Sequence, residues 1–441
     1  MSAFAPAQIP SEAGERGFAD IDTTSTTYPF SADPVVPLEP TRPGWRWHRL
    51  TAIARLATGH TPSRRCPEYW NGDIPWLQLP DIRALDGGVA LDTLEHTNEL
   101  GIKNSAAVLL PEGTVCLSRT ASVGFVTVMG RPMATSQDFV NWVCGPELSP
   151  EFLKWLLVAC RQPIRQLGSG ATHQTIYFPT VEQFSVCIPP RVEQERIAAR
   201  LTARLGIVER AQAAATDRLA LAESLPASLL REVFDGPDAS GWETRTIDEF
   251  ATTCSGATPS RGNAEFFGGG IPWVKTGELR DGFVGDDGST EESVTEAALG
   301  ACSLPLLPPK TLLIAMYGQG KTRGRTGILT REATTNQACF AILPDPSVFE
   351  TSFLQLWFRA KYSDLRALTE NRGGNQPNLN GVLLRELQVP LPDVATQRRI
   401  AADLSVRLAA AENVIARCRQ ELADLEALPS ALLRAAFNGA S

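Results

Sequence analysis

Two stretches of the chain place apolar residues at alternating steps of three and four, a spacing that predicts long helices. They run from Gln194 to Gly236 and from Gln397 to Gly439, and the second follows the first by 203 residues without a gap. Both are rich in Ala, Leu, Arg and Glu, which favour helices. The steps form a heptad seam, the pattern of two helices that pack side by side. The predicted seam residues are Leu205, Val208, Gln212, Ala215 and Leu219 in the first stretch and Leu408, Ala411, Ile415, Cys418 and Leu422 in the second.

The length of this seam favours a helical partner. A helix from Gln194 to Ser224 would be about 45 Å long at about 1.5 Å per residue. Gln212 lies among apolar seam positions, where one polar residue can fix the register of two helices. The alternative is that each helix packs only on its own neighbouring domain. We favour mutual packing, because so long and narrow a seam suits another helix.

The sequence before each helix is also repeated. Ile74-Pro75-Trp76 returns as Ile271-Pro272-Trp273, 197 residues later. Short alternating segments follow in both copies and predict strands, including a hairpin, and then a short helix. A repeat of this size indicates two similar domains. The predicted fold is α+β, with two pseudo-symmetric globular domains at 44–190 and 241–392, each followed by a long helix, at 191–236 and 393–439.

Residues 1–43 precede the repeat and differ from it in composition. They are rich in Pro, Ser, Thr and Ala, and five prolines between Pro29 and Pro43 interrupt any regular structure. This composition predicts a flexible or extended arm that lies outside the repeat.

Composition and charge exclude several classes of protein. The formal net charge of −8 argues against indiscriminate binding of polyanions, although a few loops could still concentrate cations. No apolar run is long enough to span a bilayer, and the first residues do not form a signal peptide. The nine cysteines have no paired spacing, and the four histidines form no metal-ligand pattern. We therefore expect a cytoplasmic protein with reduced thiols, no membrane contact and no metal site.

The sequence contains no credible catalytic site. The run from Ala315 to Thr322 resembles a phosphate-binding loop, but Ala315 stands where that motif requires its first glycine. The residues that follow are poor helix formers, whereas such a loop must lead into a helix. The signatures of dinucleotide binding, metalloproteases and serine hydrolases are also missing. We expect a non-catalytic chain that binds no cofactor of its own.

The predicted hairpin tips carry the strongest binding signal. In the second copy, Gly318 to Arg325 places three cations on a glycine-rich loop. Such a cluster costs electrostatic repulsion unless an anion arrives, and Arg and Lys suit guanine edges and phosphates. The tip of the first copy, Ser118 to Ser122, has one cation and three hydroxyls. The alternative is that both tips are ordinary solvated turns. Gln137 and Gln337 precede strands in both copies and could read adenine or merely fix a loop.

If the two domains bind different half-sites, their shared features are scaffold or phosphate contacts, and the base readers lie where the copies differ. This reasoning singles out the hairpin tips, Arg64 and Arg65 against Arg261, and the polar loops before the long helices. The full set of candidate DNA-binding residues is Arg64, Arg65, Arg119, Thr120, Ser122, Gln137, His173, Gln174, Arg261, Gln319, Lys321, Thr322, Arg323, Arg325, Gln337, Arg372 and Asn375.

The order of these features resembles the DNA-specificity subunit of type I restriction–modification enzymes. The resemblance rests on tandem domains that are each followed by a long helix, on the two Ile-Pro-Trp motifs, and on three local motifs in the second copy. These are Gly318-Gln-Gly-Lys-Thr-Arg-Gly324, Ala333-Thr-Thr-Asn-Gln337 and Asn375-Gln-Pro-Asn-Leu379. Each long helix also begins with Gln-x-Arg-Ile. The first copy lacks the Gly-Gln-Gly-Lys-Thr-Arg loop, so its half-site should differ.

The resemblance implies a division of labour. Each domain would read one half of a split double-stranded DNA target, and the two helices would pair antiparallel as a coiled-coil spacer. The helices would dock two methyltransferase subunits that bring S-adenosylmethionine. Motor–nuclease subunits, which use ATP and Mg, would complete the restriction enzyme. The alternatives are a tandem binding module for a glycan or a protein, and an enzyme with an unrecognised site. Glycan sites would require exposed aromatic residues at the tips, whereas these tips offer Tyr317 but mostly cations.

Overall fold

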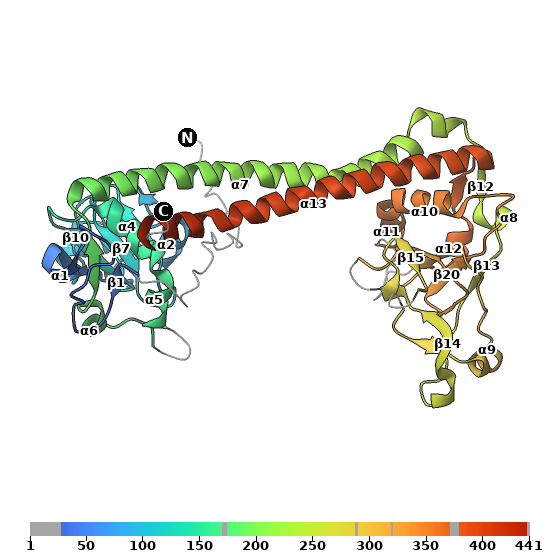
Figure 1. The fold of residues 1–441 in the computed structure, drawn as a ribbon, viewed down its shortest axis with the longest axis horizontal. Helices are drawn as coiled ribbons and strands as arrows, with labels where there is room; N and C mark the ends of the chain where they lie inside the picture. The colour runs from blue at the N-terminus through green and yellow to red at the C-terminus, as the bar shows by residue number, and fades with distance from the viewer. Residues whose placement is uncertain (1–27, 170–173, 287–289, 319–320, 371–378, 439–441) are drawn as a thin grey trace. The chain divides into compact units, whose positions relative to one another are not determined.

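The computed structural model describes residues 28–169, 174–286, 290–318, 321–370 and 379–438 (Figure 1). By internal contacts the chain divides into two compact units. Unit 1 comprises the residues up to Asp217 together with those from Arg419 onward, and unit 2 comprises Arg218–Cys418. Each unit therefore contains one globular domain and parts of both long helices.

Unit 1 is built around a five-stranded sheet with the order β3-β10-β7-β8-β5. All neighbours are antiparallel except β5 and β8, and β7 and β8 form the predicted hairpin. Two three-stranded sheets, β1-β11-β2 and β6-β4-β9, complete the strand structure. The bounds are β1 (Phe30–Ser31), β2 (Arg46–Arg49), β3 (Ala54–Thr58), β4 (Trp70–Leu77), β5 (Val89–Ala90), β6 (His96–Thr97), β7 (Val115–Ser118), β8 (Val126–Met129), β9 (Ala134–Thr135), β10 (Phe139–Cys144) and β11 (Ser185–Ile188).

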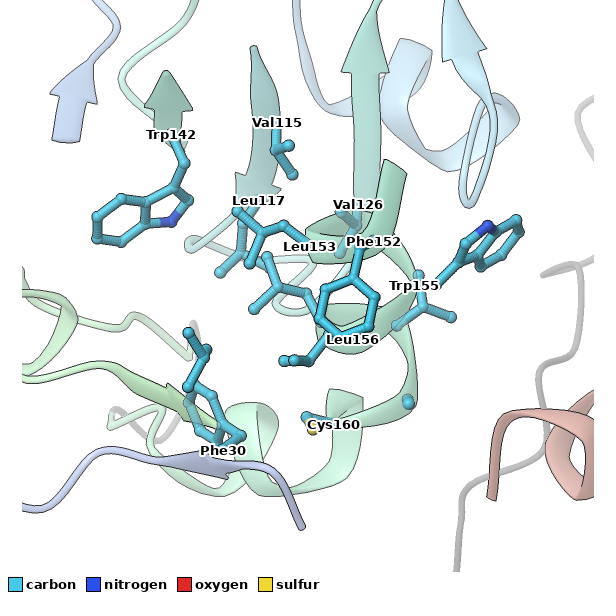
Figure 2. Close-up of a cluster of buried hydrophobic side chains, with 14 of the residues drawn as sticks. Phe30, Val115, Leu117, Val126, Trp142, Phe152, Leu153, Trp155, Leu156 and Cys160 are labelled. Carbon is cyan, nitrogen blue, oxygen red and sulfur yellow. The ribbon is translucent and has the colours of Figure 1, made fainter. Parts of the chain in front are cut away.

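The core of unit 1 lies between this sheet and α4. Figure 2 shows Phe152, Leu153 and Leu156 of α4 in one buried cluster with Leu117 and Val126 of the hairpin. Burying these large apolar side chains contributes most of the stability of such a layer. The short helices of unit 1 are α1 (Leu50–Ile53), η1 (Pro67–Tyr69), α2 (Leu79–Ala84), α3 (Glu99–Lys103), α4 (Pro150–Ala159), α5 (Arg161–Gln166) and α6 (Phe178–Val181).

Unit 2 repeats this arrangement. Its sheets have the orders β13-β20-β17-β18-β15, β16-β14-β19 and β12-β21. The strands are β12 (Thr244–Thr246), β13 (Thr253–Ser255), β14 (Phe267–Val274), β15 (Gly282–Val284), β16 (Ser293–Val294), β17 (Leu312–Ala315), β18 (Thr326–Leu329), β19 (Thr334–Thr335), β20 (Cys339–Ile342) and β21 (Gln388–Pro390). The short helices are η2 (Pro237–Gly241), α8 (Ile247–Phe250), η3 (Ala264–Phe266), η4 (Thr276–Glu278), α9 (Glu296–Cys302), α10 (Thr351–Ala360), α11 (Tyr362–Glu370) and α12 (Gly381–Arg385).

The two long helices are α7 (Arg191–Phe234) and α13 (Val394–Asn438), and they run antiparallel within each unit. In unit 1, Leu205 near the start of α7 shares a core with Phe437 at the end of α13. In unit 2, Phe234 at the end of α7 shares a core with Ile400 near the start of α13. Each domain is thus completed by the last turn of the helix that follows the other domain. The predicted α+β fold with two antiparallel paired helices is confirmed.

Most of the predicted seam residues are buried on α7 and α13. Within the seam, Gln212 of unit 1 donates a hydrogen bond from Nε2 to the carbonyl oxygen of Leu425, at 2.9 Å. In a regular helix that carbonyl would accept from the amide four residues later, but this residue is Pro429, which has no N–H. Gln212 therefore replaces a bond that the proline removes. Seven predicted seam residues are buried, namely Leu205, Val208, Ala215, Leu408, Ala411, Ile415 and Cys418, and Leu219 and Leu422 are half-buried.

The glutamine that begins each repeated helix motif anchors the helix to its domain. Gln194 is fully buried, accepts from the amide of Ser149 at 2.9 Å and donates to the carbonyl of Pro189 at 2.8 Å. Gln397 is also fully buried and makes the equivalent bonds to Glu350 and Pro392, both at 2.8 Å. The repeated Gln-x-Arg-Ile motif therefore has a structural role, because its amide satisfies backbone groups where the strand turns into the helix.

The predicted arm requires a correction, because the described part of it, residues 28–43, belongs to unit 1. Strand β1 pairs with β11, and Phe30 is buried in the main core against the ring of Phe184, at a centroid distance of 4.9 Å. Arg42 donates to the carbonyl of Ala436 near the end of α13, at 3.0 Å. The prolines interrupt helices but are compatible with an edge strand and an extended connection. Residues 1–27 lie outside the described part of the chain.

Candidate nucleic-acid interface

The tip of the β7–β8 hairpin packs on the polar loop that precedes α6. The amide of Ile176 donates to the carbonyl of Arg119 at 2.9 Å, and the amide of Ala121 donates to the carbonyl of Gln174 at 3.0 Å. Thr120 also pairs with Thr175 as an isolated bridge. Two segments that are more than 45 residues apart in the sequence therefore form one surface, with Gln174 exposed on it.

Two predicted readers of this tip brace it from within. Ser122 is only 8% exposed, and its hydroxyl accepts a hydrogen bond from Nε of Arg83 at 2.9 Å. The guanidinium of Arg119 donates to the carbonyl of Ile176 at 3.3 Å and lies 5.0 Å from the ring centroid of Phe178. The expectation of a free hydroxyl at Ser122 is wrong, because the hairpin turns this side chain inward. Arg83, which the sequence analysis did not single out, holds it there.

The tip in unit 2 folds onto α11, and this changes the interpretation of its cations. The hydroxyl of Tyr362 donates to the carbonyl of Lys321 at 2.7 Å, and Gly324 turns with a φ of +85° against the ring of Tyr362. As a result Arg323 is only 5% exposed. The expectation that Arg323 is presented to DNA on an exposed tip is therefore wrong. Lys321 is exposed, Thr322 is half-buried, and Tyr317 is 38% exposed.

Arg325, the third cation of this tip, is also part of the framework. Its guanidinium pairs with the carboxylate of Asp281 and lies 5.1 Å from the ring of Tyr362. Asp281 also accepts from the amide and the hydroxyl of Thr326, at 2.9 and 3.0 Å. The arginine is therefore neutralised within unit 2, and the expectation of a free cation at this position is wrong.

Arg64 and Arg261 occupy the same place in the two copies. The prediction that this position differs between the copies is therefore wrong. Arg64 pairs with Glu95 at 2.5 Å and lies 5.0 Å from the ring centroid of Trp76. Arg261 pairs with Glu292 at 2.6 Å and lies 5.2 Å from the ring of Trp273. By the rule that shared features are scaffold or phosphate contacts, this pair does not distinguish two half-sites. Arg65, beside Arg64, is exposed.

These ion pairs lower the pKa of the carboxylates that take part in them. The hydrogen bond from Arg64 lowers the pKa of Glu95. Hydrogen bonds from Arg261 and from Lys275 lower the pKa of Glu292. Both carboxylates stay ionised at neutral pH, so each arginine faces a fixed negative charge.

The amides of Gln137 and Gln337 are likewise used in the same way in both units. The hydroxyl of Thr61 donates to Oε1 of Gln137 at 2.6 Å, and Thr258 makes the equivalent bond to Gln337. All but Thr61 are exposed, and Thr61 is half-buried. Four further candidates lie outside the described residues, namely His173, Gln319, Arg372 and Asn375.

The described residues contain neither a candidate metal cluster nor a helix suited to cross a membrane. Among them, no group of three His, Cys, Asp or Glu side chains could hold a metal ion. No helix in the described segments combines the length and the apolar character that crossing a membrane requires.

Comparison with known proteins identifies the family. A model of the type I restriction modification DNA specificity domain matches residues 43–209 and 239–415. The chain is 22% identical over 304 residues to the MjaIX specificity subunit of Methanocaldococcus jannaschii, which covers 65% of this chain and 69% of that protein. It is 32% identical over 147 residues to the EcoprrI specificity subunit of Escherichia coli, which covers 33% of this chain and 36% of that protein.

Two solved structures share the fold. One comes from work on complex assembly and conformational transition of the type I R-M system, with a TM-score of 0.67 and 21% identity over 91% of this chain and 100% of that chain. The other is the HsdS subunit of Thermoanaerobacter tengcongensis, with a TM-score of 0.61 and 21% identity over 90% of this chain and 97% of that chain. Because the family model matches both globular domains and most of the chain, this protein belongs to the type I restriction–modification DNA-specificity subunits.

Proposed function

We propose that units 1 and 2 each read one half of a bipartite DNA target, and that the differences between their hairpin tips set the two half-sites. The specificity subunits of this family supply DNA sequence specificity with two recognition domains and are not themselves catalytic. The observation that carries the proposal is that two domains with one framework present different tips. Unit 1 presents the half-buried Thr120 and the exposed Gln174, whereas unit 2 presents the exposed Tyr317 and Lys321.

The framework itself supports this assignment. The arginine–carboxylate pairs of Arg64 and Arg261 and the threonine–glutamine pairs are the same in both units. Groups that are identical in two domains cannot distinguish two sequences, so they suit phosphate contacts or scaffold roles. Exposed tip residues that differ are free to contact base edges in a major groove.

The proposed complex contains two methyltransferase subunits, one for each unit. A surface that binds two identical partners must occur twice, and the helices offer such a surface. Leu225 in unit 2 and Leu428 in unit 1 occupy the same position in the repeat and are 39% and 41% exposed. In this proposal these two exposed leucines mark the repeated docking position on the helices. In this proposal the methyltransferases carry S-adenosylmethionine, motor–nuclease subunits carry ATP and Mg, and the assembly works in the cytoplasm.

The test is a map of methylated adenines in the source genome. In cells with the intact chain, modification should fall on a split sequence with two defined halves, and deletion of this chain should abolish it. Exchanging the hairpin tip of unit 1 for that of unit 2 should change one half of the sequence and leave the other half unchanged. Modification of an unsplit sequence would contradict the proposal. So would an exchange that changes both halves of the modified sequence.

A further inference from the structure

Arg83 and Arg280 occupy the same position in the two units but are used differently. Two residues before each arginine, an acidic side chain accepts a hydrogen bond that closes a turn. Asp81 accepts from the amide of Gln78 at 2.9 Å, and Glu278 accepts from the amide of Lys275 at 2.9 Å. The framework is therefore the same up to these arginines.

In unit 1 this arginine is occupied by the hairpin tip. Arg83 donates to the hydroxyl of Ser122, and Asp86, three residues later, accepts from the amide of Val126 at 3.0 Å. The position thus lies next to the hairpin at its tip, and in unit 1 it serves to brace that tip.

In unit 2 the same position is left open. The turn is two residues shorter, so Asp281 directly follows Arg280 and takes the place of Asp86. Thr322 takes the place of Ser122 but is not bonded to Arg280. Arg280 is exposed, and no hydrogen bond or ion pair joins its side chain to any other described residue. The carboxylate of the neighbouring Asp281 binds Arg325 and Thr326, and no ion pair joins it to Arg280.

We propose that Arg280 contacts a DNA phosphate and positions unit 2 on its half-site. This inference rests on the proposed function. Arg280 lies just before β15, which pairs with β18 of the hairpin, and Lys321 lies on the tip of that hairpin. Both side chains are exposed, and within the described residues neither has an anionic partner. An exposed cation without an anionic partner is available to an anionic ligand, and the phosphate backbone of DNA supplies anions at regular spacing. A phosphate contact fixes orientation without reading a base.

The experiment measures DNA binding by the chain assembled with its methyltransferase subunits, as a function of salt concentration. Arg280→Ala should weaken binding to cognate and unrelated duplexes alike by roughly tenfold, as expected for one lost charge-assisted bond. The plot of log affinity against log salt should lose about one unit of slope. Arg280→Lys should retain most of the affinity and the slope, because it keeps the charge.

A matched variant isolates the effect. Arg417→Ala removes an exposed arginine on the surface of α13 and should leave the affinity and the salt slope unchanged. Unchanged affinity for Arg280→Ala, with a loss for Lys321→Ala, would overturn this inference and leave the proposed function intact. Relaxed sequence preference without a change in slope would mean that Arg280 reads a base and would overturn the phosphate assignment. A wild-type complex with no sequence preference would overturn the proposed function instead.

Discussion

Units 1 and 2 each hold their hairpin with an equivalent aspartate, but the arginine that pairs with this aspartate comes from a different position. In unit 1, Asp86 pairs with Arg161 of α5, at 2.6 Å, and both side chains are buried. In unit 2, Asp281 pairs with Arg325 of the hairpin itself, and Tyr362 stands at the position of Arg161. In both units the aspartate accepts a hydrogen bond from a backbone amide of the hairpin, whereas its arginine partner lies on a different element. A repeated fold can therefore convert a cation of its own binding loop into a structural one.

This difference also explains the contrast between the tips. The unit 1 tip is braced from outside by Arg83 and Arg161, and its exposed residues are small or neutral. The unit 2 tip uses two of its own arginines internally, so only Lys321 of its three cations is exposed. Counting cations along a loop therefore overestimates the charge that a ligand meets.

The largest expected change in the assembly, the loss of a whole subunit, concerns a feature that the two units share. Leu428→Glu should remove one methyltransferase subunit from the complex, and Leu225→Glu should remove the other, because a buried unpaired carboxylate costs at least about 2 kcal/mol, roughly thirtyfold in affinity. Native mass spectrometry or mass photometry would count the subunits. Glu426→Gln, near Leu428 on α13, serves as the control. Retention of both subunits in the double variant would show that docking occurs elsewhere.

The next effect separates the two aspartates. Asp86→Ala leaves the buried guanidinium of Arg161 without this carboxylate and should cost about 3–5 kcal/mol in the free energy of unfolding. Asp281→Ala should cost less, about 1–2 kcal/mol, because the side chain of Arg325 is 34% exposed and water can replace the carboxylate. Urea unfolding of both variants measures the difference. Equal losses would mean that burial does not distinguish the two pairs.

Arg323→Ala tests whether the buried cation belongs to the framework. We expect a loss of about 1–3 kcal/mol in stability, since the substitution empties a buried position in the hairpin. Lys321→Ala, only two residues earlier but exposed, should change stability by no more than about 0.5 kcal/mol. Thermal unfolding compares them. An unchanged melting temperature for Arg323→Ala, together with a weaker sequence preference at one half-site, would indicate that Arg323 contacts DNA bases.

The smallest expected effect concerns the helix seam. Gln212→Leu removes the donor to the carbonyl of Leu425 and should cost about 1–2 kcal/mol, the range for a carbonyl left without a partner. The matched position in unit 2 is Ile415, an apolar residue opposite a helix that also contains a proline, Pro226. Ile415→Leu should change stability by less than about 1.5 kcal/mol. Equal losses at both positions would indicate packing rather than the hydrogen bond.

The sequence by itself determined the repeat, the α+β class, the two long helices and their seam, and through its motifs the family. The helices and their seam follow from periodicity, which acts over one or two helical turns and can be read locally. The repeat follows from motifs that return 197 to 203 residues later. The motif Gln-x-Arg-Ile was visible in both copies, but its role as a buried anchor required the backbone groups that Gln194 and Gln397 meet in space.

Only the tertiary structure decided which cations are available to a ligand. Arg64 meets Glu95 across 31 residues, Arg325 meets Asp281 across 44, and Gln212 meets Leu425 across 213. No local pattern indicates such pairings, because they depend on which strands and helices the fold brings together. A charge in the sequence becomes a binding group only where folding leaves it without a partner, and folding assigns partners over distances that periodicity does not reach.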